Sequence, residues 1–390
     1  MKNLSMYLPP FSPDYSGICS ALFEFNGMII IHDAAGCTGN YVGFDEPRWY
    51  GSKKAVYCSA LRKMDVVLGN EQKYIDRIIS ASKVNNPEFI AFVGSPVPLV
   101  MGTDFEGVCM DIETATGIPC FGFPADISKF YGYGIAEGTN ALLKRFLKPV
   151  TDKKKGQINI LGATPIDFTE ENFQDMKEFF KDAGYTIGCS LSMDVNMEQV
   201  RNLTQSEINI AVSQGGVLIG EYLKNEYGMP YVCGVPIGEK GSKILLKQIE
   251  KILDNEEFCY EFTGTKENEN VLIIYDAVTA MSMKNSLQED FNMTNVTIAT
   301  PFGMEGNLPD VLNLEDEGEI LDLLNKEEWD IVISDPMITK LLKKQTGNIN
   351  LAHYGVSSKI GRPYAKGYIY NKFNNIIKET SYEKQTNKID

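Results

Sequence analysis

The chain has 390 residues, which is enough for two or three domains, because single hydrophobic cores stop growing well below this length. Its formal net charge of −15 argues against binding to nucleic acids, whose phosphates require clustered Lys and Arg. No apolar run reaches the roughly 20 residues of a membrane helix, and the N-terminus lacks the apolar core of a signal peptide, so we expect a cytoplasmic protein with no membrane partner.

The first predicted strand is the apolar run at residues 28–32, which ends in His32 and leads through small residues to Cys37. A buried strand of this kind delivers its last residues to a tight turn. A second apolar run, residues 88–94, ends in the same way at Ser95. For the remainder of this block, apolar spacing predicts helices at 71–84, 103–117 and 134–147, and a further strand at 118–123.

The alternation of strands and helices restarts after each of two charged runs, residues 148–156 and 254–270. Such runs are typical of linkers, so we predict domains at residues 1–150, 151–260 and 261–390. In the later blocks we expect strands at 157–162, 186–190, 208–213, 230–235, 271–275, 296–299, 330–334 and 349–352, and a last helix at 368–377 before a polar tail.

These strands are apolar throughout, which is typical of parallel sheets that helices cover on both faces. We therefore predict an α/β fold of three doubly wound, Rossmann-like domains around a central cleft. Ligands of such sheets bind beyond the carboxyl ends of the strands. Four chemically capable positions each follow a predicted strand, and we expect them to converge on inter-domain clefts: Cys37, Ser95, the pair Gly215 and Gly216, and His353.

Several nucleotide motifs are absent. The chain has no GxxxxGK[ST] loop, so we expect no ATP site on it. The glycines at residues 132–138 follow a GxGxxxG spacing, one residue longer than the dinucleotide fingerprint, so we expect no NAD.

The chain has eight cysteines and two histidines, and these numbers limit the kinds of metal site that it can form. The chain has no CxxC pair, and two histidines exclude a multi-histidine metal site within one chain. We interpret Cys109, Cys120, Cys189 and Cys233 as reduced core thiols, because they lie on apolar faces of predicted elements.

The run IHDAAGC at residues 31–37, followed by CSALRKMDVVLGN at 58–70, resembles the nitrogenase component 1 superfamily. In that family a strand ends in a histidine-containing turn whose cysteine binds a bridging iron–sulfur cluster. The resemblance continues at residues 95–104, 226–231 and 351–368, so it covers essentially the whole chain.

The resemblance implies an iron–sulfur cluster of the 4Fe–4S type with Cys37 as a ligand. The family's other cluster cysteines match Ser12 and Ser95, so Cys19 and Cys58 would replace them, and a partner subunit or a carboxylate would supply the fourth ligand. Ser95 is either a ligand or the remnant of a lost cysteine. Cys19 and Cys58 have the alternative role of buried core thiols.

The resemblance also matches His353 to a histidine that faces the family's cofactor, while a simple loop role is the alternative. Residues 212–213 are Val-Ser where true nitrogenase anchors its cofactor by cysteine, so we do not expect that cofactor or dinitrogen reduction. His32 is either a catalytic hydrogen-bond donor to the cluster or a structural histidine.

By this resemblance the chain is the catalytic component of a two-component reductase. It would pair with itself or a homologous subunit, accept electrons from an ATP-dependent iron protein, and reduce a small molecule or metallocofactor bound near His353, Gly215 and Gly216. Two other functions are open: a scaffold for metallocluster assembly, and a cluster-free three-domain binding protein.

Overall fold

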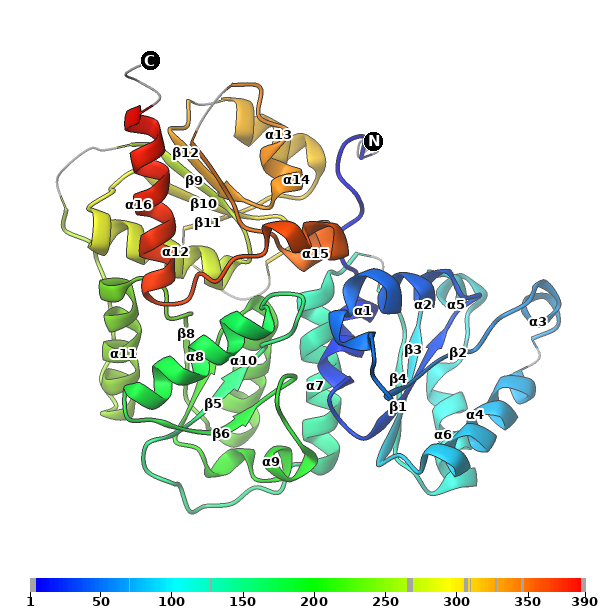
Figure 1. The fold of residues 1–390 in the computed structure, drawn as a ribbon. Helices are drawn as coiled ribbons and strands as arrows, with labels where there is room; N and C mark the ends of the chain where they lie inside the picture. Colours follow the sequence, from blue (N-terminus) through cyan, green and yellow to red (C-terminus); the bar gives the residue numbers. More distant parts are fainter. Residues whose placement is uncertain are drawn as a thin grey trace.

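The computed structural model describes residues 5–386 except 70, 127, 265–268, 305–307, 309, 327 and 345–346, so part of the predicted second linker and the end of the tail lie outside it. Within the described residues the chain forms three sheets, and every strand pair in them is parallel (Figure 1). The predicted α/β fold with three doubly wound sheets is confirmed. No helix in the described ranges is long and apolar enough to cross a membrane.

The first sheet has the strand order β2-β1-β3-β4. Its central strands β1 and β3 are fully apolar runs whose ends lie side by side, with His32 paired to Gly94. The strands are β1 (Gly27–His32), β2 (Ala55–Cys58), β3 (Phe89–Gly94) and β4 (Cys120–Phe123), and the helices are α1 (Asp14–Leu22), α2 (Gly36–Asn40), α3 (Lys63–Leu68), α4 (Glu71–Asn85), α5 (Pro96–Met101), α6 (Phe105–Thr116) and α7 (Tyr131–Phe146).

The second sheet has the strand order β6-β5-β7-β8. It lies across α7 from the first sheet (Figure 1). The strands are β5 (Gln157–Leu161), β6 (Thr186–Ser190), β7 (Ile208–Ala211) and β8 (Tyr231–Cys233), and the helices are α8 (Glu170–Asp182), α9 (Met197–Arg201), α10 (Gln214–Tyr227) and α11 (Glu239–Leu253).

The third sheet has the strand order β11-β10-β9-β12-β13. Its strands are β9 (Val271–Ile274), β10 (Val296–Thr300), β11 (Val311–Asn313), β12 (Ile331–Ser334) and β13 (Gly347–Asn350), and the helices are α12 (Ala277–Phe291), α13 (Glu317–Lys326), α14 (Pro336–Thr339), α15 (Tyr354–Ser357) and α16 (Asn371–Thr386). The last helix begins and ends later than the predicted 368–377.

The three blocks contact one another through a few elements. Helix α7 packs on α1 and α10, and so joins the first sheet to the second. The backbone amide of Tyr368, just before α16, donates to Asn172 in α8, 3.0 Å away. The N-terminal segment runs from α1 to the third block beside α15 (Figure 1). Through these contacts the carboxyl ends of strands from different sheets come close to one another.

Candidate functional site

Cys37 lies in α2, directly beyond the end of β1. The turn before it is tight, because Ala35 has a φ of 109°, a conformation that residues with a side chain rarely adopt. The carboxylate of Asp33 accepts hydrogen bonds from the backbone amides of Ala35 and Thr38 at 2.9 and 3.0 Å. These bonds hold the turn so that the Cys37 thiol is half-buried at its tip.

Two hydroxyl groups approach the Cys37 thiol, from Tyr15 in α1 and from Ser95 at the end of β3. Burial and the Asp33 carboxylate raise the pKa of the Cys37 thiol, while the nearby Tyr15 and Ser95 hydroxyls act in the opposite direction and lower it. Ser95 is fully buried, and its hydroxyl has no hydrogen-bond partner among the described residues. The structure therefore brings Cys37 and Ser95 together, in a site that supplies hydrogen-bond donors to one sulfur.

The other two candidate thiols have different surroundings. Cys19 is fully buried inside α1, and burial followed by the Glu46 carboxylate holds its pKa well above the usual range. The Cys58 thiol is 3.4 Å from the backbone oxygen of Asp33, to which it donates, and it accepts from the amide of Ala60 at 3.2 Å. Asp33 thus contacts the Cys37 turn with its carboxylate and Cys58 with its carbonyl.

In the part of the chain that the structure describes, no group of three or more Cys, His, Asp or Glu side chains is placed to hold a single metal ion. A cluster separates its ligands more widely than a single ion does. The predicted ligand set of Cys19, Cys37 and Cys58 therefore stays a prediction.

His32 points into an aromatic cluster. Its ring packs on Tyr74, Phe92 and Phe105, with centroid distances of 4.6, 4.7 and 6.3 Å. Its Nδ1 shares a 2.9 Å hydrogen bond with the Ser59 hydroxyl. Burial lowers the pKa of His32 to about 4, so the ring is neutral at physiological pH. These contacts attach the end of β1 to the residue that follows β2, while the buried Nε2 of His32 has no hydrogen-bond partner among the described residues.

His353 follows β13 and is 1% exposed. Its Nδ1 accepts from the Gly355 amide at 3.0 Å, which leaves Nε2 as the protonated nitrogen, 3.4 Å from both the Asp167 carboxylate and the Tyr131 hydroxyl. Tyr131 donates to Asp167 at 2.7 Å. Because Tyr131 begins α7 and Asp167 follows β5, this triad joins residues from all three blocks.

Aromatic rings fill the space around His353. The rings of Phe302 and Tyr275 lie 4.6 and 4.8 Å from the imidazole. The neighbouring cavity, lined by Asp167 and Ala352 among others, has a volume of about 10 Å³, which holds one water molecule at most. The room for a substrate that the sequence predicts beside His353 is thus occupied by side chains in this conformation.

Gly215 and Gly216 serve close packing at the start of α10. A Cβ atom on Gly215 would lie 2.8 Å from the carbonyl oxygen of Gly132 in α7, and one on Gly216 would lie 2.2 Å from that of Leu161 in β5. Such distances are impossible, so the pair lets α10 touch α7 and β5. Tyr131 stands between this contact and His353, whereas Cys37 and Ser95 lie together at the first sheet.

Sequence reasoning missed Tyr15, and it missed the pairing of Arg48 with the buried carboxylate of Glu46. The Arg48 guanidinium bonds both oxygens of Glu46 at 2.7 Å. A PRW sequence after an acidic residue carries no motif that would indicate burial. Tyr15 offers no signal either, because its contact with Cys37 arises from tertiary packing of α1.

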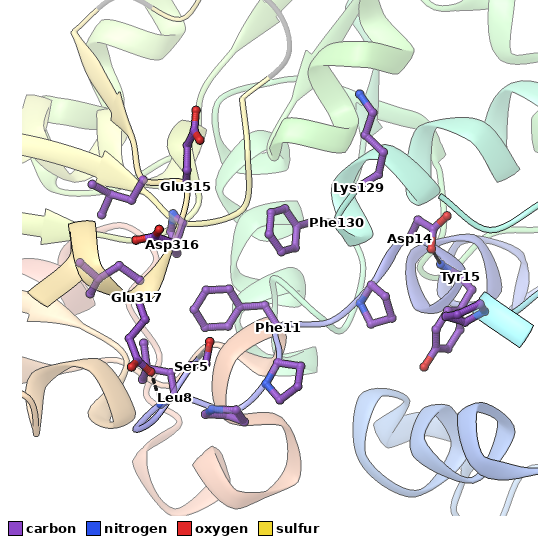
Figure 2. Close-up of a pocket in the computed structure, with 17 residues that line it drawn as sticks. Ser5, Leu8, Phe11, Asp14, Tyr15, Lys129, Phe130, Glu315, Asp316 and Glu317 are labelled. Carbon is purple, nitrogen blue, oxygen red and sulfur yellow. Dashed lines mark hydrogen bonds between the residues drawn. The ribbon is translucent and has the colours of Figure 1, made fainter. Parts of the chain in front are cut away.

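The structure also contains a cavity that the sequence does not predict. A cavity of about 400 Å³ lies between the N-terminal segment, the start of α7 and the third block (Figure 2). Tyr15 forms part of its wall, so it adjoins the Cys37 site. No motif or spacing in the sequence indicates a cavity beneath the N-terminal segment.

Comparisons with known proteins agree with this fold. A family model described as nitrogenase component 1 type oxidoreductase matches residues 14–361. The nitrogenase molybdenum-iron protein alpha chain of Methanosarcina barkeri is 27% identical over 263 residues, which cover 62% of this chain and 46% of that protein. The nitrogenase iron-molybdenum cofactor biosynthesis protein NifE of Clostridium pasteurianum is 24% identical over 291 residues, which cover 68% of this chain and 62% of that protein.

A third relative is a subunit of the light-independent protochlorophyllide reductase of Zygnema circumcarinatum, 19% identical over 314 residues that cover 67% of this chain and 60% of that protein. The matches thus span about half to three fifths of the length of these curated relatives. A solved structure of nitrogenase Cp1 at pH 5 has the same fold, with a TM-score of 0.66, 15% identity and coverage of 98% of this chain and 89% of that chain.

Proposed function

Because the chain belongs to the nitrogenase component 1 type oxidoreductase family, we propose that it is the catalytic component of a nitrogenase-like two-component reductase. It would receive electrons from an ATP-dependent iron protein in the cytoplasm and pass them to a bound substrate. The absence of a phosphate-binding loop in this sequence agrees with ATP hydrolysis on that partner.

We retain the division into domains at residues 1–150, 151–260 and 261–390, since each sheet takes its strands from one of these ranges.

The observation that carries this proposal is the Cys37 site. A half-buried thiol at a strand end, approached by two hydroxyl donors, suits a cluster ligand, because thiolates hold iron–sulfur clusters and hydrogen bonds to sulfur adjust their potential. The fully buried Ser95 hydroxyl has no other partner in the described chain, so it is free to donate to a ligated sulfur.

In the proposed holoprotein Cys37 holds the cluster, with Cys58 and Cys19 as further candidates from this chain. The cluster would relay single electrons. Asp33 keeps the turn rigid through its bonds to the Ala35 and Thr38 amides, and the nearby hydroxyls of Tyr15 and Ser95 would donate to the ligated sulfur. These residues position one ligand before the cluster arrives, which lowers the cost of assembling the site.

The surface next to Cys37 supports a second subunit. Residues 34–36 of the turn are exposed, and helix α5 beyond Ser95 exposes Val97, Leu99 and Val100. Phe44 and Tyr50 are also exposed on the segment that follows α2. Exposed apolar residues gathered in this way are typical of interfaces. An identical or homologous subunit there would supply the missing cluster ligands and bury the Cys37 turn.

The test is the iron and sulfide content of protein that is produced anaerobically with both supplied. We expect sulfur-to-iron charge-transfer absorbance in the visible range, its loss in Cys37→Ala, and its retention in the matched control Cys259→Ala, whose thiol is exposed in the second linker. Wild-type protein without this absorbance would refute the cluster. Full iron content in Cys37→Ala would refute the ligand assignment.

A second measurement addresses the reductase activity. The cluster of the anaerobic protein should be reduced by an iron protein only when ATP is hydrolysed, and the absorbance change reports this directly. A cluster that is transferred intact to an acceptor protein, and is not reduced, would instead indicate the assembly scaffold.

A further inference from the structure

The cavity in Figure 2 lies where parallel sheets bind ligands. Pro96 lines it directly beyond β3, Pro301 beyond β10 and Leu314 beyond β11. The carboxyl ends of strands from the first and third sheets therefore open onto the same cavity. Its volume of about 400 Å³ is within the usual range for small-molecule sites. Helix termini and the N-terminal segment close the other sides.

The walls of the cavity are rigid and apolar. Phe11 and Phe130 lie side by side (Figure 2), with ring centroids 6.2 Å apart and planes tilted by 51°. Phe11 also packs on Phe302 at 5.7 Å. Prolines form much of the remaining wall: Pro9, Pro10, Pro13, Pro96 and Pro301. Flat rings stack on such aromatic faces with a favourable geometry, and rigid walls lose little entropy when a ligand binds.

The charged groups of the lining are mostly carboxylates. Asp14 lies at the α1 side, and Glu315 and Asp316 lie at the opposite side, before α13 (Figure 2). Lys129 also lines the cavity, with its ammonium over the Tyr133 ring, 4.7 Å from the centroid, so the carboxylates of the lining outnumber its one ammonium. A cavity with this lining attracts a cation and repels an anion such as a phosphate ester or a carboxylate.

The cavity connects the two chemically capable regions of the molecule. Tyr15 lines it and directs its hydroxyl to the Cys37 sulfur, and Pro96 follows Ser95. On the other side, Phe302 packs against both Phe11 and the His353 ring. A molecule in the cavity is therefore one side chain from the Cys37 site and one side chain from His353.

We propose that this cavity, and not the filled junction at His353, binds the substrate, and that the substrate is a flat, unsaturated ring compound that is uncharged or cationic. The inference that the ligand is a substrate rests on the proposed function, whereas the binding itself does not. The rings of Phe11 and Phe130 supply the stacking surface. The carboxylates of Glu315 and Asp316 select against anions.

Binding is tested with two fluorescent three-ring probes of the same size and opposite charge, 9-aminoacridine and anthracene-9-carboxylate. The full-length protein without iron is titrated with each probe at physiological salt. We expect saturable binding of one 9-aminoacridine per chain, and binding of the carboxylate that is weaker by about tenfold or more. Equal affinities, or no saturable binding of the cationic probe, would overturn the proposal.

Variants locate the probe. Phe11→Ala and Phe130→Ala each remove one stacking face and should weaken 9-aminoacridine binding by about tenfold. Tyr57→Ala removes a 40% exposed ring outside the cavity and should have no effect. Undiminished binding to both cavity variants, with native circular dichroism, would show that the probe binds the acidic surface elsewhere.

A separate variant tests the preference of the cavity for the cationic probe. Asp316→Asn keeps the acceptor that caps the Glu319 amide at 3.0 Å but removes one carboxylate. We expect the preference for the cationic probe to fall about threefold, and an unchanged preference would refute charge selection. Cys37→Ala separates probe binding from the cluster proposal, because this variant should lose iron and retain probe binding.

Discussion

The guanidinium of Arg48 is a partly buried cation that pairs with the buried carboxylate of Glu46. Besides both Glu46 oxygens it contacts the Glu24 carboxylate at 3.1 Å and the backbone oxygen of Ser192 at 2.8 Å. Glu46 is itself only 1% exposed, so its charge depends on this partner. We expect Arg48→Ala to lower the free energy of unfolding by about 3–5 kcal/mol, since it leaves a buried carboxylate unpaired.

Chemical denaturation at pH 7 measures the effect of Arg48→Ala. The matched control is Arg145→Ala, which breaks the solvent-exposed pair with Glu113 and should cost less than about 1 kcal/mol. If the two variants lose the same free energy of unfolding, water reaches the Glu46 carboxylate and the Arg48–Glu46 pair behaves like a solvent-exposed one.

Glu137 in α7 gives the fold a pH dependence. Burial, and then the carboxylates of Asp14 and Asp126, raise the pKa of Glu137 to about 7. The folded chain thus binds this proton more tightly than the unfolded chain, so the stabilisation is complete below about pH 4.5 and is lost as the pH rises through 7. Glu137→Gln removes the ionisation and should stabilise the fold by about 1 kcal/mol at pH 8, allowing for solvent screening.

Melting curves of wild type and Glu137→Gln at pH 5 and pH 8 test this sign. The two proteins should melt together at pH 5 and differ at pH 8, with the variant the more stable. The exposed carboxylate of Glu178 in α8 provides the control, and Glu178→Gln should track wild type at both values. A variant that is less stable at pH 8 would mean that ionised Glu137 has a favourable partner.

At the scale of elements, α1 and α7 approach so closely that their backbones touch. A Cβ atom on Gly134 would lie 1.9 Å from the carbonyl oxygen of Asp14, and one on Gly17 would lie 1.9 Å from that of Tyr131. We expect Gly134→Ala to lower the free energy of unfolding by about 3 kcal/mol, because backbone atoms cannot move aside. In the control Gly39→Ala the new methyl meets nothing within 4 Å, so thermal denaturation should show no loss.

This contact explains the GxGxxxG spacing at residues 132–138. The count of residues argues against a dinucleotide loop, which stays a prediction, and the sequence cannot show that Gly134 and Gly138 face α1. The central strands were predictable for a simple reason: β1, β3, β5, β9 and β12 are buried on both faces and so read as apolar runs. Helix α16 was placed too early, because its polar C-terminal half carries little apolar spacing.

The candidate site was predictable only in part. Cys37 and Ser95 meet because β1 and β3 are neighbours, and parallel neighbours end at the same sheet edge. Tyr15 and the aromatic filling around His353 come from segments far away in the chain, including Phe302. Such contacts depend on how three separate sheets pack together, and no local pattern encodes that.

At the scale of the whole molecule, the contacts between the three blocks determine which parts of the structure can move. The triad of Tyr131, Asp167 and His353 binds elements of all three sheets at one buried point. A large displacement of one block would expose that polar triad, which is costly. The N-terminal segment crosses from α1 to α13 and forms one wall of the cavity, so it is the part of the wall whose movement leaves the triad intact.

This segment is attached at its far end by one carboxylate. Glu317, the first residue of α13, accepts hydrogen bonds from the backbone amides of Met6, Tyr7 and Leu8 at 2.8, 2.9 and 2.7 Å. Hydrogen bonds to a charged acceptor are about twice as strong as neutral ones. We expect Glu317→Ala to release these three amides, and their hydrogen–deuterium exchange should quicken by about tenfold or more.

The exchange experiment also decides what holds the segment in place. Glu328→Ala removes a carboxylate that pairs with Lys344 elsewhere in the third block, and it should leave exchange at residues 6–8 unchanged. If Glu317→Ala exchanges like wild type, the packing of Phe11 on Phe130 and Phe302 is sufficient to hold the segment. Faster exchange in Glu317→Ala together with faster entry of 9-aminoacridine would identify the Glu317 contact as the latch of the cavity.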